Sequence, residues 1–363
     1  MNPTLLAAPR GTTEKTGKVR VLIVDDSVVI RHLLREALES DPGIEVVGSE
    51  GNGQAALAAI PLVKPDLVTL DIEMPVLDGL EALKRIRKDH PRLRVVMFST
   101  LTTRGAAATL EALSLGADDY VAKASNAGKL DESLGRLRSE LLPKIRQFFT
   151  NPGRAGQPAL PLLTPTRSFP KSKPRVLVIG VSTGGPNALA KLIPALPSRL
   201  PLPVLIVQHM PPTFTRLLAE RLDAASPLRV LEAEDGMEVA PGRVIIARGD
   251  YHLRVRKMGP QTVCALDQGP HENSCRPAVD VLFRSAAEAY GGAVLSAVLT
   301  GMGSDGQRGT ETVKAAGGYS IAQDEPSSVV WGMPGAVVEA GLANQVLPLE
   351  KIPPEIVRLV ENG

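Results

Sequence analysis

Short, uninterrupted apolar runs alternate with helical patterns through residues 19–142, and this alternation limits the possible folds more than any other feature. Apolar runs without interposed polar residues are typical of parallel strands in a sheet that is covered on both faces. The helical patterns between the runs end near Pro or Gly. This part of the chain therefore predicts a doubly wound (βα)5 domain. Its predicted strands are residues 19–24, 44–48, 66–70, 94–98 and 120–122.

The same α/β pattern resumes at Val176, with predicted buried strands at residues 176–179, 204–207 and 293–299. The stretch 229–267 differs because Gly-containing turns separate its apolar segments, which indicates an antiparallel insertion in an otherwise parallel sheet. The segments of that insertion are residues 244–247, 251–257 and 262–266. We therefore expect an α/β protein with two doubly wound domains.

A Pro-rich segment separates the two α/β patterns. Residues 144–175 contain seven basic residues and no acidic residue, with Pro scattered among Gly, Ser and Thr, as in an extended spacer. The predicted organisation is a flexible tail at 1–17, a first domain at 18–143, a linker at 144–174 and a second domain at 175–363.

Composition excludes several classes of protein. The formal net charge of +2 gives no overall field that favours nucleic acid. No apolar run approaches the roughly 18 residues of a membrane helix, and the first ten residues lack the apolar region of a secretory signal, so we expect a cytoplasmic protein without membrane insertion. Cys264 and Cys275 lack zinc-site spacing and are expected to be ordinary thiols.

Acidic residues follow two predicted strands of the first domain. Asp25 and Asp26 follow the first strand, and Asp71 follows the third. Because ligands gather at the carboxyl ends of such strands, these carboxylates predict a Mg²⁺ site, with Asp71 as a nucleophile for a phosphoryl group. Ser99 and Lys123 end the fourth and fifth strands and supply a hydroxyl and a cation for phosphoryl oxygens. Taken singly, each residue favours the alternative of a solvated loop, but five such residues in matching topological positions argue against it.

The motifs that carry these residues resemble a response-regulator receiver domain over residues 19–142. They are V-D-D-S at 24–27, L-D-I-E-M-P-V-L-D-G at 70–79, F-S-T at 98–100 and A-K at 122–123. The resemblance implies that Asp71 is the phospho-acceptor, that Asp25 and Asp26 help to bind the metal, and that Ser99 and Lys123 are switch residues. Ala124 departs from the family pattern, which usually has Pro after the Lys.

In the second domain, the segment G-V-S-T-G at 180–184 places Ser182 between a predicted strand and a helical segment. This is the G-x-S-x-G context of a nucleophilic serine, with the N–H groups of a helix N-terminus close to a developing oxyanion. A phosphate-binding turn or an N-capping Ser fits the five residues as well. A general base is therefore needed to decide.

His209 is the best placed base, because it follows the strand at 204–207 at the same sheet edge as Ser182. A core His is the alternative. His252 is expected on the polar face of a hairpin, and His271 lies in a loop. Asp305 follows the strand at 293–299 and is the best residue to orient the imidazole. We predict a Ser182, His209, Asp305 triad, in preference to Asp280 in a probable helix.

A competing interpretation uses the same late segment. G-M-G-S-D-G at 301–306 fits the dinucleotide fingerprint G-x-G-x-x-G, and Asp324 lies 18 positions beyond Gly306. A nicotinamide-dependent oxidoreductase is therefore the second hypothesis. It is disfavoured because this fingerprint usually opens a Rossmann unit, and because it leaves Ser182 and His209 without a role.

Further segments resemble the CheB family of chemotaxis protein-glutamate methylesterases and glutaminases, over about residues 19–360. They are V-I-G-V-S-T-G-G-P at 178–186, V-Q-H-M-P-P-T-F-T at 207–215, R-P-A-V-D-V-L-F at 276–283, L-T-G-M-G-S-D-G at 299–306 and A-Q-D-E at 322–325. The resemblance implies the same triad. It also implies that Thr183 lies near the imidazole and that the Met302 N–H contacts the oxyanion.

The function that this resemblance implies is phosphorylation-activated demethylation of glutamate esters on the cytoplasmic domains of chemoreceptors, with deamidation of receptor glutamines as a second activity. A chemotaxis histidine kinase would supply the phosphoryl group, the receiver would use Mg²⁺, and the esterase would need no cofactor. The unphosphorylated receiver would cover the active site. A binding module with a vestigial site is disfavoured by the intact triad, and a DNA-binding regulator by the absence of a basic recognition helix pattern in residues 176–363.

Overall fold

The first domain is a five-stranded parallel sheet with the strand order β2-β1-β3-β4-β5. The computed structural model describes residues 17–123, 130–149, 170 and 172–362. The strands are β1 (Val19–Val24), β2 (Ile44–Glu50), β3 (Leu67–Asp71), β4 (Arg94–Ser99) and β5 (Asp119–Ala122). The helices are α1 (Val28–Glu39), α2 (Gly53–Val63), α3 (Gly79–Asp89), α4 (Thr103–Ser114) and α5 (Leu130–Phe149). Strand order and parallel pairing confirm the predicted doubly wound domain.

Polar N-caps start the first four helices directly after the loops at the carboxyl edge of the sheet. A side-chain oxygen of the capping residue accepts a hydrogen bond from a backbone N–H in the first turn, which replaces a partner that the helix itself lacks. These capping residues are Ser27, Asn52, Asp78 and Thr102. The caps fix the loop lengths, and the loops carry the acidic residues of the predicted phosphorylation site.

The second domain has a seven-stranded parallel sheet with the order β14-β13-β12-β6-β7-β9-β8. Its strands are β6 (Val176–Val181), β7 (Val204–Gln208), β8 (Arg229–Glu232), β9 (Arg243–Ile246), β12 (Val294–Val298), β13 (Tyr319–Gln323) and β14 (Gln345–Leu347). The helices are α6 (Gly185–Leu192), α7 (Pro212–Ala225), α8 (Val279–Tyr290), α9 (Gln307–Ala315), α10 (Gly332–Glu339) and α11 (Ile352–Asn362), with short 3₁₀ turns η1 (Ile193–Ala195), η2 (Gly291–Ala293) and η3 (Leu349–Lys351).

Only part of the predicted antiparallel insertion is antiparallel. β10 (His252–Met258) and β11 (Gln261–Asp267) form a separate antiparallel pair, as expected. β9, however, pairs in parallel with both β7 and β8 inside the main sheet. The prediction for residues 244–247 was wrong because the Gly242 turn resembles a hairpin turn, whereas the buried side chains of β9 belong to the central sheet.

Helix α5 extends to Phe149 and therefore includes the first six residues of the segment 144–174 that was expected to be a linker. Lys144, in this helix, contacts Asp119 and donates a hydrogen bond to the Tyr120 carbonyl. Most of the remaining segment lies outside the described residues, as do Ala124 and all but the last residue of the tail predicted at 1–17. No described helix has both the length and the apolar character needed to span a membrane.

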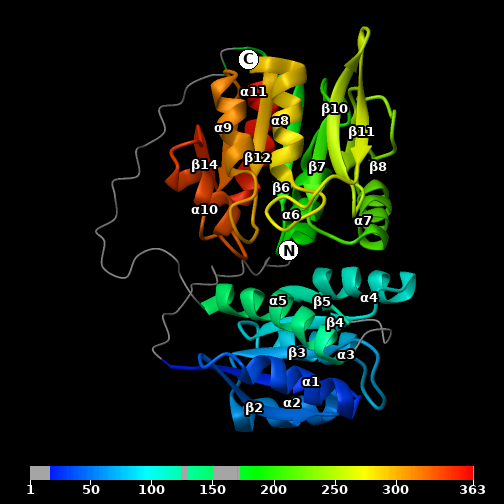
Figure 1. Cartoon of the computed structure of the whole chain (residues 1–363), viewed down its shortest axis with the longest axis vertical. Helices are drawn as coiled ribbons and strands as arrows, with labels where there is room; N and C mark the ends of the chain where they lie inside the picture. Colours follow the sequence, from blue (N-terminus) through cyan, green and yellow to red (C-terminus); the bar gives the residue numbers. More distant parts are fainter. Residues whose placement is uncertain (1–16, 124–129, 150–169, 171, 363) are drawn as a thin grey trace, which may run out of the picture.

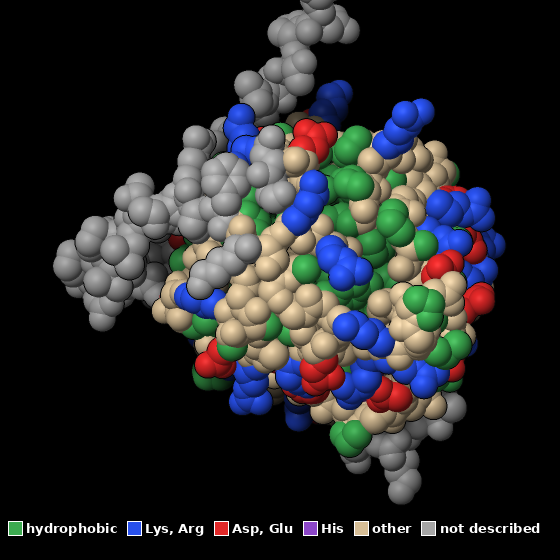
Figure 2. Space-filling model, turned by 90° about the horizontal axis from the view of Figure 1, so that it is seen from above, with side chains coloured by type: hydrophobic (Ala, Val, Ile, Leu, Met, Phe, Trp, Pro, Cys, Tyr) green, Lys and Arg blue, Asp and Glu red, His purple; other side chains and the backbone are tan. Residues whose placement is uncertain are grey.

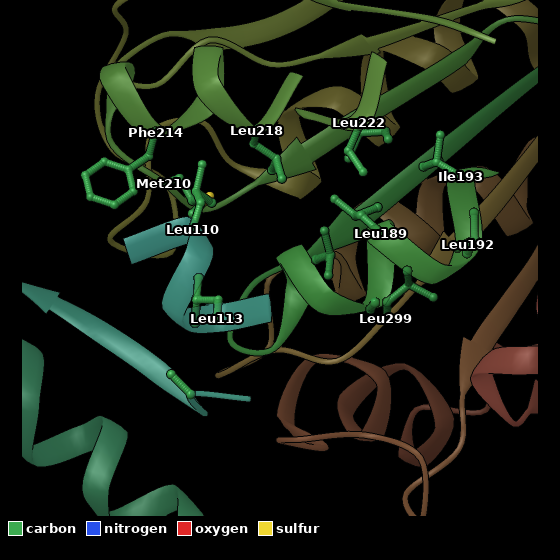
Figure 3. Packing of buried hydrophobic residues seen from close by; sticks show 14 of the residues in the cluster. Leu110, Leu113, Leu189, Leu192, Ile193, Met210, Phe214, Leu218, Leu222 and Leu299 are labelled. Carbon is green, nitrogen blue, oxygen red and sulfur yellow. The ribbon is translucent and has the colours of Figure 1, made fainter. Parts of the chain in front are cut away.

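The two domains pack against each other through α4 and β5 of the first and α6 and α7 of the second (Figure 1). One buried hydrophobic cluster extends across the contact, where Leu110 and Leu113 of α4 meet Met210 and Phe214 (Figure 3). The rings of Tyr120 and Phe214 stack with their centroids 4.8 Å apart. This contact covers the edge of the second sheet that carries the predicted triad.

The opposite face of the second domain points away from the first domain. Figure 2 shows that Lys and Arg side chains on this face are interspersed with Asp and Glu around exposed hydrophobic side chains. A surface with both signs of charge lacks the single-sign basic patch of a nucleic-acid binder.

Candidate functional site

The predicted phosphorylation site is assembled at the carboxyl edge of the first sheet. Asp25, Asp26 and Asp71 each offer a carboxylate oxygen, and these oxygens lie within 4.8 Å of one another. Lys123 places Nζ 2.9 Å from Asp25 Oδ2 and 2.8 Å from Asp71 Oδ2. Three acidic oxygens this close together suit a hard divalent cation such as Mg²⁺, which prefers carboxylate ligands.

The surroundings of the Asp71 carboxyl disfavour its ionised form. Burial raises the pKa of its carboxyl to about 6; the Asp25 charge acts in the same direction, and the hydrogen bond from Lys123 opposes both. The backbone N–H of Ile72 donates to Asp71 Oδ1 at 2.7 Å. A carboxylate in such a place is stabilised by added positive charge, which a bound cation would supply.

The described hydrogen bonds of the Ser99 hydroxyl are to the chain that leads into α4. The hydroxyl is buried and donates to the carbonyl of Gly105, in the first turn of α4, at 3.0 Å. This residue was expected to contact phosphoryl oxygens. In this structure it instead ties β4 to α4, the helix that packs on the second domain.

The second site lies where β6, β7 and β12 end, and these three strands are neighbours in the sheet. Ser182 follows β6, with its N–H bonded to the Thr300 carbonyl at 3.0 Å. Gly184 has a φ of 77°, a left-handed conformation that favours glycine and turns the chain into α6. A Cβ on Gly301 would lie 2.9 Å from Ser182 Cβ, so glycine is also needed at that close approach.

His209 and Asp305 are in direct contact, as the sequence predicts. His209 Nε2 lies 2.8 Å from Asp305 Oδ2. Nδ1 is therefore the ring atom that can take a proton from a nucleophile. The hydrogen bonds of the described residues do not include one between the Ser182 hydroxyl and His209. Such contacts are often long before substrate binds.

The environment of the pair favours the imidazolium form. Burial alone lowers the pKa of His209, but hydrogen bonds to Asp305 and Cys275, with their charges, raise that pKa well above 6.5. Burial raises the pKa of Asp305, yet the contact with His209 and the backbone N–H groups of Val279 and Asp280 lower it below the ordinary value. Asp305 is thus a buried, ionised partner that holds the imidazole in one orientation.

Met302 and Thr183, the two residues expected beside the triad, have different surroundings. Met302 lies in the turn between Gly301, whose N–H donates to the Val330 carbonyl, and Gly303, which has a φ of 76°. The hydroxyl of Thr183 donates to Asp119 Oδ2 of the first domain at 2.9 Å. Thr183 therefore contacts the receiver-like domain, directly beside Ser182.

The other candidate residues have structural partners. His252 is 1% exposed, accepts from the Ala278 N–H through Nδ1 and contacts the Pro270 carbonyl through Nε2. Its predicted position on a polar hairpin face was wrong because β10 starts beneath α8. Asp324, which the oxidoreductase hypothesis requires for a ribose, accepts hydrogen bonds from Ser327 in its own loop.

Two contributors, Asn273 and Asp119, were missed from the sequence. Asn273 donates to both Asp280 and Asp305, and Asp119 accepts from Thr183. Neither residue belongs to a motif with known chemistry. The local feature that marks Asn273 is the positive φ that it shares with Ser274. This feature is seen in the structure and leaves no pattern in the sequence.

Two family models match the chain: the CheB methylesterase model at residues 177–356 and the response regulator receiver domain model at residues 21–135. The protein-glutamate methylesterase/protein-glutamine glutaminase of Nocardioides sp. is 52% identical over 94% of this chain and 95% of its own length. The protein of the same name from Trichodesmium erythraeum is 48% identical over 94% of this chain and 99% of its own length.

Among solved structures, the CheB methylesterase catalytic domain of Thermotoga maritima is 48% identical, with a TM-score of 0.51. It covers 52% of this chain and all of that structure. The relatives match both α/β domains in the same order, and their identity far exceeds what a shared fold alone requires. The chain therefore belongs to the CheB methylesterase family.

Proposed function

We propose that this protein is a phosphorylation-activated serine hydrolase that demethylates glutamate methyl esters on the cytoplasmic domains of chemoreceptors. The observation that carries the proposal is the His209–Asp305 pair, which leaves Nδ1 of the imidazole as the proton acceptor at the sheet edge of Ser182. The names of the relatives support the substrate, and they support deamidation of receptor glutamines as a second activity.

The chemistry is acyl transfer. Ser182 Oγ attacks the ester carbonyl while His209 takes its proton, and the tetrahedral oxyanion is held by backbone donors, among them the N–H of Met302. His209 then returns the proton to the leaving methoxide, which departs as methanol. Water hydrolyses the acyl-enzyme by the same steps in reverse, with Asp305 orienting the imidazole throughout. With a glutamine side chain, ammonia leaves in place of methanol.

The receiver domain supplies the control. Asp71 accepts the phosphoryl group from a chemotaxis histidine kinase, and Asp25, Asp26 and Asp71 would hold Mg²⁺. When bound, the cation offsets the negative charge of the carboxylates and of the arriving phosphoryl group. Lys123 already contacts two of these carboxylates and remains to pair with a phosphoryl oxygen.

Docking of the receiver limits the unphosphorylated enzyme. Asp119 accepts a hydrogen bond from Thr183, the neighbour of the nucleophile, and α4 packs on α6 and α7. Ser99 bonds to the start of α4, so a phosphoryl group that draws this hydroxyl toward Asp71 changes the anchorage of that helix. Phosphorylation then favours a receiver conformation that docks less tightly.

Methanol release from a methylated chemoreceptor cytoplasmic domain tests the proposal. The full chain should release methanol, faster with a small phosphodonor and Mg²⁺, and Ser182→Ala should reduce release by several orders of magnitude without loss of folding. Thr103→Ala is the matched control, because this exposed residue of α4 lies outside the proposed site. Normal turnover in folded Ser182→Ala would refute the assignment. Receptor binding without any methanol release would favour a binding module instead.

A further inference from the structure

The loop between β11 and α8 carries Asn273 to two buried carboxylates. Its side-chain amide donates to Asp280 Oδ2 at 2.9 Å and to Asp305 Oδ1 at 2.8 Å. Asp280 and Asp305 are 0% and 2% exposed, whereas Asn273 itself is exposed at the surface of the loop. Both partners are carboxylates, which accept hydrogen bonds when ionised. The NH2 group of the Asn273 amide, and not its oxygen, therefore bonds to both.

Backbone N–H groups also donate to both carboxylates. Asp280 Oδ1 accepts from the N–H groups of Gly306 and Gly309 at 3.0 and 2.6 Å. Asp305 Oδ1 also accepts from the backbone of Asp280 and Gly306, each at 3.0 Å. The amide of Asn273 is therefore the side-chain donor that links one carboxylate to the other. Without it, the Gly306 N–H would be the remaining donor shared by the two carboxylates among the described contacts, and their mutual repulsion would be less well offset.

The backbone that presents Asn273 is strained and is held by its surroundings. Asn273 and Ser274 have φ values of 52° and 61°, in the left-handed region that costs a non-glycine residue free energy, although Asn tolerates it better than most. Glu272 and Cys275 exchange backbone hydrogen bonds at 3.1 and 2.9 Å across this turn. Such strain persists only where neighbouring contacts enforce it, and it is common at functional sites.

The charges around Asp305 come from several elements. Asp280 starts α8, His209 follows β7, and the thiol of Cys275 contacts the imidazole from the same loop as Asn273. Arg284 and Glu272 form a two-bond ion pair at 2.7 and 2.6 Å, so their charges largely offset each other. Asp280 is therefore the acidic group that shares the Asn273 amide with Asp305, and it has no ion pair of its own among the described residues.

We infer that Asn273 is a positioning residue for catalysis, whose amide separates Asp280 from Asp305 and fixes the Asp305 carboxylate against His209. This inference rests on the proposed serine-hydrolase function. Asn273 acts through Asp305, and its effect is expected in the turnover step more than in substrate binding. Because the loop is exposed and water can partly replace the amide, the loss should be smaller than for removal of a triad member.

Three variants of the full chain test the inference, assayed with methylated receptor domain, phosphodonor and Mg²⁺. Asn273→Gly removes the amide while accepting the left-handed backbone without strain. Asn273→Asp keeps the shape but replaces the donor with a third acceptor. Ser274→Gly is the matched control, because it relieves the same backbone strain at the next residue and keeps the amide. Melting temperatures are measured for all three.

Asn273→Gly should lower kcat about 10- to 100-fold with little change in KM, as expected for a misplaced catalytic group. The acidic limb of its kcat/KM profile should move to higher pH, because Asp305 loses a donor and holds the proton on His209 more strongly. Asn273→Asp should be less active than Asn273→Gly. Ser274→Gly should match the original protein in kcat and in pH profile.

The outcomes that would overturn the inference are distinct from failure of the proposed function. Wild-type kcat and an unmoved acidic limb in Asn273→Gly would refute it, provided that Ser182→Ala is inactive in the same assay. A fall in kcat without a shift of the acidic limb, accompanied by a lower melting temperature, would assign Asn273 to folding alone. Methanol release that survives Ser182→Ala would overturn the proposed function, and this inference with it.

Discussion

In the proposed mechanism, the Asp305 carboxylate determines the pH at which His209 can act as a base. A general base must be neutral, and the contact with Asp305 raises the pKa of His209 above its ordinary value of 6.5. Proton removal from Ser182 therefore becomes more effective as the pH rises through that raised pKa. The contact with Asp305 fixes the orientation of the imidazole, and it also raises the pH at which His209 becomes neutral.

We predict that kcat/KM for methanol release increases with pH with a midpoint above 6.5. Asp305→Asn should lower that midpoint toward 6.5, because the charge that favours the imidazolium is gone, and it should also reduce the maximal rate. Measurement of kcat/KM from pH 5 to 10 on the full chain with phosphodonor checks both effects. Asp324→Asn is the control, since its carboxylate serves only its own loop in the described contacts. An unchanged midpoint in Asp305→Asn would contradict the role of this carboxylate.

At the scale of elements, α7 connects the catalytic sheet to the receiver. Arg221 of α7 donates to the Leu110 carbonyl of α4 at 2.7 Å, whereas Arg216 of the same helix pairs with Glu220 within α7. The first contact therefore crosses between domains and the second does not. This difference makes the two arginines a matched pair for testing the docked state.

Arg221→Ala should weaken docking by about 1 kcal/mol, the typical net worth of one hydrogen bond. A change of that size multiplies the ratio of undocked to docked enzyme by about five, so basal methanol release without phosphodonor should increase by roughly that factor. Arg216→Ala should leave basal release unchanged. Equal basal rates in the two variants would show that the α4–α7 contact does not limit activity.

The parallel sheets and the grouping of polar residues at the strand ends were predictable because parallel strands bring their carboxyl ends to one edge. That rule placed Asp71 beside Asp25, and Asp305 beside His209, across long stretches of sequence. β9 was mispredicted because a turn glycine does not reveal whether the next strand forms a hairpin or enters the central sheet. The fold class was confirmed, whereas the roles of the site residues stay predictions.

Other features depend on tertiary contacts that leave no local pattern. The burial of His252 follows from the packing of α8 over the start of β10, although its alternation with Arg254 and Arg256 favoured an exposed position. The contact between Thr183 and Asp119 joins two domains, and periodicity within either domain contains no information about it. Asn273 reaches Asp305 through a backbone conformation that its sequence neighbours do not specify.

In the whole molecule, phosphorylation of the receiver can control the catalytic edge of the second sheet through Asp71 only if Asp71 is the residue that takes the phosphoryl group. Asp71→Asn should abolish stimulation of methanol release by a phosphodonor while leaving basal release nearly unchanged, because the amide does not form the aspartyl phosphate. Asp78→Asn is the matched control, since Asn also caps α3 and the residue is not part of the acidic cluster. Retained stimulation in Asp71→Asn would move the phosphorylation site elsewhere.

Docking of the receiver on the second domain also leads to a prediction about the activity of the second domain alone. Residues 171–363 include the complete second sheet, and the solved catalytic domain of the Thermotoga maritima relative matches this part of the chain. Removing α4 and β5 frees Thr183 from Asp119 and uncovers Phe214, so this domain should release methanol faster than the unphosphorylated full chain. It should not respond to phosphodonor. If the isolated domain were no faster than the unphosphorylated full chain, covering of the site would not be the control, and phosphorylation would have to create a productive contact between the domains instead.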